Sequence, residues 1–248
     1  ARVLAMRGHQ VSLHEKQAAL GGQMRLAAAA PYREEMPPAL SWWKNELERL
    51  QVRIHLNAAV TSEDDIDADT IIWAVGADPG HTAIWRLRPF LFEGIPGAES
   101  LPSGRDVLAG TAKASGEVLI IDEEGGWPAV SLAETLIADP AVSALTVTTP
   151  ERSLGEAALS LTWEVRSVPA RLRSAGIKVM TETQVRQVTG QSVELMDGVT
   201  IGPFHTIILS TGTVANTTPE GALAIGDCLA PRGIWAATSD AAKLARSL

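Results

Sequence analysis

Cysteine is almost absent from this chain: Cys228 is the single one among 248 residues. One cysteine excludes an internal disulfide, a C-x-x-C redox pair and an iron–sulfur cluster ligated by cysteines of this chain alone. We expect Cys228 to be a small buried residue. The five histidines show no metal-ligand spacing, and the serines lie in no nucleophile elbow, so the sequence nominates no catalytic residue and no metal ligand.

Basic residues and long apolar runs are also scarce. The chain has 21 Lys and Arg against 29 Asp and Glu, a net charge of -8, and no basic stripe. Because phosphate backbones attract clustered Lys and Arg, this balance argues against nucleic acid as a partner. No apolar run approaches the roughly 20 residues that span a bilayer, and no signal segment opens the chain. We therefore expect no membrane partner and a cytoplasmic setting.

Tyr and Phe are few, whereas Trp occurs seven times, and we expect most of these indoles to pack in the core. The apolar pattern alternates between the periods of strands and helices, which predicts an α/β fold. The predicted strands are 9–15, 52–56, 71–75, 117–122, 144–149, 177–180, 185–188, 193–195, 206–210 and 222–227. The predicted helices are 38–50, 128–137, 163–175 and 234–248, and residues 77–104 form a long Gly- and Pro-rich connection.

The order of these elements repeats one plan twice. The repeat predicts two Rossmann-like dinucleotide-binding domains, the second inserted into the first. If the strand at 222–227 returns to the first domain, that domain comprises residues 1–105 and 222–248. The inserted domain then comprises residues 106–221.

Glu15 ends the first predicted strand. In a dinucleotide-binding βαβ unit, an acidic residue that holds a ribose hydroxyl follows the first glycine of G-x-G-x-x-G by about 20 residues. Counting back from Glu15 passes the first residue of the chain. We therefore expect the chain to begin inside the first helix, which Gly8 ends, and to lack the first strand of the first domain.

Three short motifs of the first domain are suited to hold a nucleotide. The carboxylate of Glu15 can accept hydrogen bonds from both ribose hydroxyls. Gly21 and Gly22 let the backbone approach a pyrophosphate or flavin, unless Gln23 faces away and the pair is a plain turn. The backbone of Gly226 and Asp227, before the last helix, can face a phosphate, although Asp227 can equally cap that helix.

The second domain has an imperfect glycine turn. Alignment with G-x-G-x-x-G places Glu124, Gly126 and Ala129 at the three glycine positions. The carboxylate of Glu124 would repel a pyrophosphate, because like charges at short range repel by several kcal/mol. At the end of the next strand, residues 148–152 do not clearly provide the acidic residue that would hold a ribose. The sequence therefore disfavours a nicotinamide nucleotide in this domain.

Four segments carry a resemblance to a known family: Arg7–Val11 with Glu15–Lys16, Leu20–Gln23, Pro31–Glu35, and Ile225–Arg232. They resemble the C-terminal half of the NADH:flavin oxidoreductase family, which includes trimethylamine dehydrogenase and 2,4-dienoyl-CoA reductase. The resemblance covers nearly the whole chain. It implies that an FMN-binding TIM barrel with a four-iron cluster, both absent here, precedes this part of the protein.

The resemblance also implies a cofactor and its site. The cofactor is FAD or ADP, and the candidate residues that bind it are Glu15, Lys16, Gly21, Gly22, Gln23, Val60, Ala74, Gly76, Gly226 and Asp227. The run Asp122–Ala129 looks more like the trimethylamine dehydrogenase type, in which this region carries only ADP and electrons leave to an electron-transferring flavoprotein. The expected partners are thus an adenine nucleotide, the barrel portion and that flavoprotein.

Three functions remain open from the sequence. The first is the nucleotide-binding portion of an amine dehydrogenase whose FMN chemistry lies in the barrel. The second is an electron-input module that binds FAD and NADPH, as in dienoyl-CoA-reductase-like enzymes. The third is a scaffold without catalysis, whose bound nucleotide is structural.

Overall fold

The structure is a computed structural model that describes residues 1–80 and 94–248. It is a mixed α/β protein that divides into two compact units. Unit 1 comprises Ala1–Ala28, Arg33–Asp78 and Thr213–Leu248, and unit 2 comprises Ala29–Tyr32 and Pro79–Gly212. Within the described residues, no helix has the length and apolar character needed to cross a membrane. The domain boundaries expected from the sequence stay a prediction.

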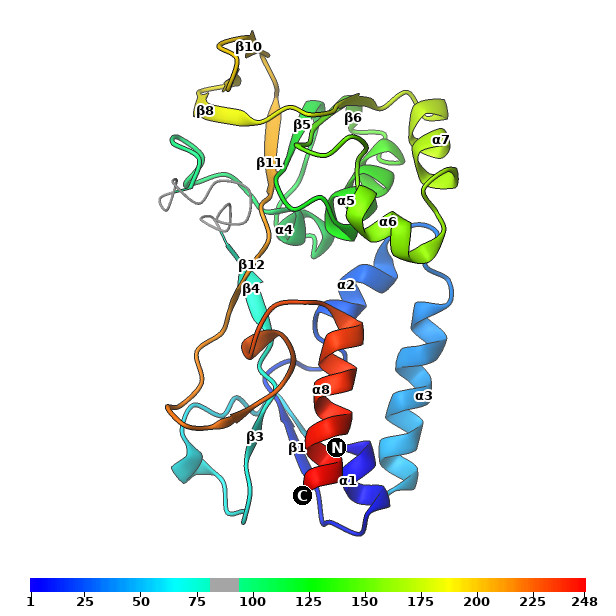
Figure 1. The fold of residues 1–248 in the computed structure, drawn as a ribbon, viewed down its shortest axis with the longest axis vertical. Coiled ribbons are helices and arrows are strands. Elements are labelled where there is room, and N and C mark those ends of the chain that lie inside the picture. Colours follow the sequence, from blue (N-terminus) through cyan, green and yellow to red (C-terminus); the bar gives the residue numbers. More distant parts are fainter. Residues whose placement is uncertain (81–93) are drawn as a thin grey trace. The chain divides into compact units, whose positions relative to one another are not determined.

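Unit 1 contains short parallel strands and the longest helices (Figure 1). Its elements are α1 (Arg2–Met6), β1 (Ser12–Glu15), α2 (Gln23–Ala29), α3 (Met36–Arg49), β2 (Arg53–Leu56), β3 (Ile72–Trp73), β4 (Ala77–Pro79), β12 (Thr213–Ala215), β13 (Leu223–Ala224) and α8 (Ile234–Ser247), with 3₁₀ turns at Glu63–Asp65 and Gly226–Cys228. β1 pairs with β2 and β3 with β13, both in parallel, and β4 pairs with β12. The chain thus leaves unit 1 at β4 and later re-enters it, where β13 pairs with β3.

The helix predicted at 38–50 is α3, which begins two residues earlier. Its apolar face buries Leu47, and its polar side holds an ion-pair cluster. The Glu46 carboxylate accepts from Arg2 Nε at 2.8 Å and from Arg49 Nε at 2.7 Å, which joins α1 to α3. The hydrogen bond from Arg49, followed by that from Arg2, lowers the pKa of Glu46 to about 2.

Two strands of unit 1 are much shorter than the sequence predicts. The strands expected at 71–75 and 222–227 are reduced to Ile72–Trp73 and Leu223–Ala224. Each pairs with the other, and the ladder ends at Trp73 and Ala224, shortly before Gly76 and Gly226, which adopt φ angles of 72° and 69°. A left-handed residue turns the chain out of the extended conformation, so neither strand continues past its glycine.

Unit 2 is built on a four-stranded parallel sheet in the order β11-β5-β6-β7. Its elements are α4 (Gly104–Leu108), β5 (Gly116–Asp122), α5 (Trp127–Ile137), β6 (Val142–Thr148), α6 (Glu156–Thr162), α7 (Ser167–Ser174), β7 (Lys178–Met180), β8 (Val185–Thr189), β9 (Ser192–Leu195), β10 (Thr200–Ile201) and β11 (Thr206–Ser210). β8, β9 and β10 form a separate antiparallel sheet (Figure 1). The sequence did not predict β10.

The central strand β5 divides the core of unit 2 into two clusters. Val118 and Ile120 pack in one cluster with the buried side chains of α5 and α7, such as Ala133. Leu119 and Ile121 point to the opposite face and pack with β8 and β9. All four β5 side chains are at most 1% exposed. A strand buried on both faces is the expected position for an uninterrupted apolar run in a parallel sheet.

The helix predicted at 163–175 is α7, which begins four residues later than predicted and ends one residue earlier. The sequence did not predict α6, which precedes it, and Trp163 lies between the two helices with a φ of 63°. A left-handed residue ends α6, and Pro169 fits the first turn of a new helix because that turn needs no donor from it. Apolar spacing alone does not reveal such a break.

The expectation that most Trp side chains pack in the core is wrong. Trp163 is 91% exposed, Trp235 83% and Trp42 49%, whereas Trp73 is the one buried indole among the described residues. The Arg2 guanidinium covers the Trp42 ring at 5.1 Å, a contact that suits a half-exposed indole. Trp85 and residues 81–93 of the expected connection at 77–104 lie outside the described residues.

Candidate functional site

The end of β1 presents Glu15 as predicted from the sequence. β1 and β2 are in register with Glu15 opposite Leu56, and the carboxyl end of the pair leads into residues 16–22. Glu15 is half-buried, and its Oε1 accepts from the backbone N–H of Gln17 at 2.9 Å. In the described part of the chain, Oε2 has no protein donor, so this oxygen can accept from a ligand. The neighbouring Lys16 is exposed.

The paired glycines after β1 adopt conformations that other residues disfavour. Gly21 has a φ of 116° and Gly22 a φ of 46°. A Cβ added to Gly21 would lie 2.9 Å from Arg25 Cγ, whereas one added to Gly22 would have no described neighbour within 4 Å. The backbone at Gly22 is therefore open for close approach by another group.

Gln23 begins α2 and faces the strand end rather than away from it. Its Nε2 donates to the Ala77 carbonyl oxygen at 2.7 Å, and a Cβ on Gly76 would lie 3.8 Å from the same nitrogen. The structure thus brings together Gln23, Gly76 and Ala77. With one N–H of Nε2 engaged, the amide oxygen and the second N–H of Gln23 can still bind a ligand.

Asn216 holds the same strand end and was missed by the sequence interpretation. Its Nδ2 donates to the Val75 carbonyl at 2.9 Å, and its backbone N–H donates to the Gly76 carbonyl at 3.1 Å. An Asn that follows a short strand carries no distinctive signal, because its partner lies 141 positions away along the chain. Of two other predicted site residues, Ala74, just after β3, is exposed, and Val60, after β2, is half-buried.

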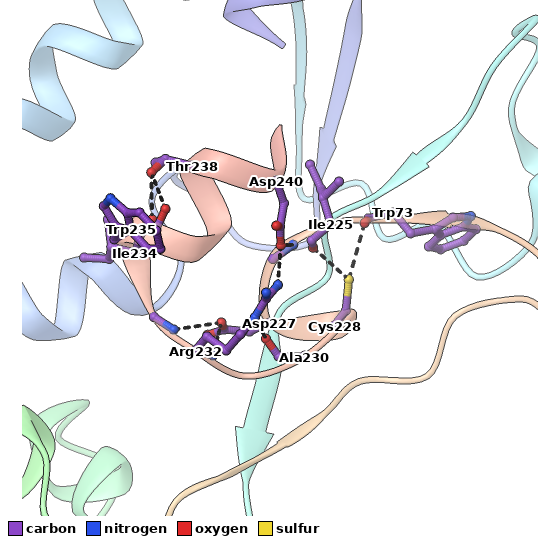
Figure 2. Close-up of polar contacts among 12 residues, drawn as sticks. Trp73, Ile225, Asp227, Cys228, Ala230, Arg232, Ile234, Trp235, Thr238 and Asp240 are labelled. Atoms are coloured by element: carbon purple, nitrogen blue, oxygen red, sulfur yellow. Dashed lines mark hydrogen bonds and ion pairs between the residues drawn. The ribbon is translucent and has the colours of Figure 1, made fainter. Parts of the chain in front are cut away.

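The loop between β13 and α8 contains Gly226 and Asp227 in a 3₁₀ turn, not at a strand end as predicted (Figure 2). Asp227 Oδ1 accepts from the backbone N–H groups of Arg232 at 3.1 Å and Gly233 at 3.2 Å. Asp227 therefore fixes the residues that precede α8, which is close to its expected capping role. The helix begins at Ile234 directly after this loop.

Asp240 on α8 ties the same loop from the other side (Figure 2). Its Oδ2 accepts from the Gly226 N–H at 3.3 Å and forms an ion pair with Arg232. A Cβ on Gly226 would lie 3.2 Å from Ala237 Cβ, so glycine permits the close approach of turn and helix. The first amide groups of α8 and its positive dipole end lie next to a rigid loop.

Cys228 is 7% exposed, which confirms the expectation of a small buried residue. Its thiol donates to the carbonyl oxygens of Trp73 at 3.3 Å and Ile225 at 3.2 Å (Figure 2). Trp73 Nε1 in turn donates to Glu63 Oε1 at 3.2 Å. The contact of Cys228 with Trp73 holds the 3₁₀ turn Gly226–Cys228 against β3.

The glycine turn of unit 2 has an anionic group that the sequence interpretation did not single out. Asp122, the last residue of β5, is 1% exposed. Its Oδ1 accepts from the N–H groups of Glu124 at 3.1 Å and Gly125 at 3.0 Å, and its Oδ2 accepts from Thr149 Oγ1 at 2.8 Å. Burial raises the pKa of Asp122 to about 6, against the lowering effect of these hydrogen bonds.

Comparison with known proteins places these sites in a wider context. No protein-family model matches the chain. The chain is 32% identical over 163 residues to a probable N-methylproline demethylase of Rhizobium meliloti, covering 65% of this chain and 22% of that protein. It is 29% identical over 247 residues to bilirubin reductase of Mediterraneibacter gnavus, covering 92% of this chain and 35% of that protein.

The fold also has solved counterparts. Histamine dehydrogenase from Rhizobium sp. 4-9 superposes with a TM-score of 0.88 at 19% identity, over 100% of this chain and 41% of that chain. At this level of identity the likeness shows a shared fold. The chain spans well under half of the length of each of these proteins. The chain is therefore related to oxidoreductases, and its relatives support the flavin-dependent family to which the sequence motifs point.

Proposed function

We propose that this chain is the adenine-nucleotide-binding portion of a flavin-dependent oxidoreductase, most similar to an amine dehydrogenase, and that unit 1 binds ADP or FAD. The observation that carries the proposal is the half-buried Glu15 at the end of β1, with Oε1 fixed by the Gln17 amide and Oε2 available. A carboxylate in this position can accept from both hydroxyls of an adenosine ribose.

The surrounding backbone fits the same ligand. The open backbone at Gly22 leaves room for a pyrophosphate, and the amide nitrogen of Gln23 lies beside Gly76. The first amides of α8 suit a phosphate or ribityl group, whereas the Gly226 amide already donates to Asp240. Lys16, Val60 and Ala74 belong to the proposed binding set through the family resemblance alone.

The catalytic chemistry of the proposed protein lies outside these residues. FMN and a four-iron cluster in a barrel portion would supply it, and this chain would hold the adenine nucleotide beside that portion. The names of two similar proteins, an N-methylproline demethylase and a histamine dehydrogenase, favour an amine as the substrate class. An electron-transferring flavoprotein is the proposed electron acceptor.

A second candidate is an electron-input module that binds FAD and NADPH. It is favoured by the alignment with a bilirubin reductase, which covers 92% of this chain. In that case unit 2 would bind the nicotinamide nucleotide and the electrons would run from NADPH through FAD. A non-catalytic scaffold with a structural nucleotide is the third candidate.

One experiment separates the first two candidates. The protein at its full encoded length is denatured, the released nucleotides are identified by chromatography, and a native sample is mixed with NADPH. The amine dehydrogenase proposal predicts FMN with ADP or FAD and no bleaching of the flavin by NADPH. Rapid bleaching would contradict it, and ADP as the only adenine nucleotide would contradict the electron-input module.

A variant tests the scaffold candidate. Glu15→Ala should lower nucleotide content and amine turnover together while the melting temperature stays close to that of the wild type. Glu34→Ala, which removes an exposed acid of the same unit, is the matched control. If Glu15→Ala changed only the melting temperature, the scaffold function would be favoured instead.

A further inference from the structure

The glycine turn of unit 2 already contains its own anion. Asp122 lies beneath the turn and accepts from the consecutive amides of Glu124 and Gly125. Thr149, at the end of the adjacent strand β6, donates to the second oxygen of the same carboxylate. Both oxygens of this buried side chain therefore have donors from the protein.

These donors are of the kind that a dinucleotide site offers to its ligand. A glycine-rich turn between a strand and a helix holds a pyrophosphate through backbone N–H groups near the start of the helix. In unit 2, α5 begins at Trp127, and the two amides just before its N-terminal Gly126 point to Asp122. A pyrophosphate at this turn would lose those donors and face a buried carboxylate.

A second carboxylate covers the turn from the loop after β6. Gly125 has a φ of 68°, and a Cβ added to it would lie 2.8 Å from both Cγ and Oε1 of Glu151. Glu151 stands in the loop where a dinucleotide-binding unit places its ribose-binding acid. Here its side chain lies against the turn glycine, so the space through which a ribose and pyrophosphate would pass is occupied.

We propose that Asp122 and Glu151 determine the ligand specificity of unit 2 by excluding the pyrophosphate of a dinucleotide from this turn. Asp122 takes the amide donors, and Glu151 fills the approach to them. The proposal concerns unit 2 alone and does not depend on nucleotide binding by unit 1.

The test is a gain of binding in the protein at its full encoded length. Calorimetric titration with NADPH at neutral pH, in the presence of excess ADP, compares the wild type with the double variant Asp122→Ala and Glu151→Ala. Ala has no side-chain acceptor, so the amides of Glu124 and Gly125 become available to a pyrophosphate. The double variant should bind NADPH at least about tenfold more tightly than the wild type, because two repulsive charges are gone.

The matched control is Glu117→Gln, which removes one charge at the opposite end of the same strand. It should bind NADPH as the wild type does. A folded double variant that gains no more affinity than this control would overturn the proposal.

A measurement on the wild type keeps the proposal testable if the double variant fails to fold. Amide hydrogen exchange of the segment 118–130 should be slow at Glu124 and Gly125 and should not change when NADPH is added. Protection of this segment by NADPH would overturn the proposal. The segment 12–24 reports separately on ADP in unit 1, so failure of the proposed function would appear there and not at the turn.

Discussion

Glu15 and Asp122 are two carboxylates at the ends of parallel strands, and their surroundings give them opposite roles. Glu15 is half-buried and shares one oxygen with a single backbone amide. Asp122 is buried and binds two amides and a hydroxyl. Glu15 can still accept a hydrogen bond from a ligand, whereas Asp122 already accepts the hydrogen bonds of the turn that follows it.

The buried Asp122 should make the stability of the protein depend on pH. Burial raises its pKa to about 6 in the folded state, above the ordinary value of 3.8. As the pH rises from about 4 to about 6, the unfolded chain releases this proton while the folded chain retains it. The free energy of unfolding should therefore fall by up to about 3 kcal/mol over this window and change no further above it.

Urea unfolding at a series of pH values checks this dependence. Asp122→Asn has no proton to release, so the difference in unfolding free energy between variant and wild type should grow in favour of the variant from pH 4 to 6. Glu117→Gln should follow the wild-type curve. A difference that stays constant with pH would contradict the assignment of this titration to Asp122.

At the scale of elements, the connection before α4 packs its backbone onto β8. Val188 N–H donates to the Pro96 carbonyl at 2.8 Å, and a Cβ on Gly97 would lie 2.1 Å from the Val188 carbonyl oxygen. Gly97→Ala should therefore destabilise the protein by about 3 kcal/mol, from the clash and the left-handed backbone together.

Gly190→Ala isolates the backbone contribution. Gly190 has a φ of 58°, and an added Cβ there has no described neighbour within 4 Å. Gly190→Ala should lower the free energy of unfolding by about 1 kcal/mol, the penalty of a left-handed non-glycine residue. Equal losses in thermal unfolding for the two variants would show that Gly97 does not contact β8.

The pairing of α5 with α7 depends on one buried acid. Glu134 is 3% exposed, and Arg171 contacts it through Nε at 2.9 Å and through Nη2, while its guanidinium carbon lies 4.0 Å from the centre of the Tyr32 ring. Removing the guanidinium takes the positive charge and both hydrogen bonds of Arg171 away from a buried carboxylate. Arg171→Ala should cost about 3 kcal/mol of unfolding free energy.

Arg173→Ala on the same helix serves as the control for this pair, because Arg173 is exposed. Its effect should be within about 0.5 kcal/mol of zero. Both variants are compared by urea unfolding at neutral pH. A loss for Arg171→Ala no larger than that for Arg173→Ala would show that the ion pair does not hold the helices together.

Long periodic elements could be predicted from the sequence with nearly correct bounds, whereas β3 and β13 were predicted too long and β10 was not predicted. α3, α5, α8 and the buried strands β5, β6 and β11 lie within a few residues of their predicted bounds, because their apolar periodicity extends over several turns or pleats. β3, β13 and β10 have two residues each, so tertiary pairing rather than local pattern determines them.

For the molecule as a whole, two units with related strand-to-turn motifs differ in what their turns can hold. Unit 1 offers an available carboxylate oxygen and an open glycine backbone. Unit 2 has its turn amides satisfied internally. We therefore propose one adenine nucleotide in unit 1 and no dinucleotide at the turn of unit 2.

Motif positions in unit 1 were predictable because glycines and acids at strand ends have distinctive spacing. The fold was needed for the contacts that join distant segments, such as Asn216 with Val75 and Gln23 with Ala77. The role of Asp122 was not predicted for a different reason: the glycine motif aligns with Glu124, two residues later, and does not include Asp122. A buried Asp that accepts from the amides of its own turn is visible only in the folded chain.

The contact between Glu15 and a ribose hydroxyl is tested most directly by comparing ADP with 2′-deoxy-ADP. Calorimetric titration of the nucleotide-free protein at its full encoded length should show a preference of about tenfold for ADP, because a hydrogen bond to a charged group is lost with the 2′-hydroxyl. Glu15→Gln should lose most of this preference, and Glu34→Gln should retain it. Equal affinity of the wild type for the two nucleotides, or a full preference in Glu15→Gln, would contradict the account.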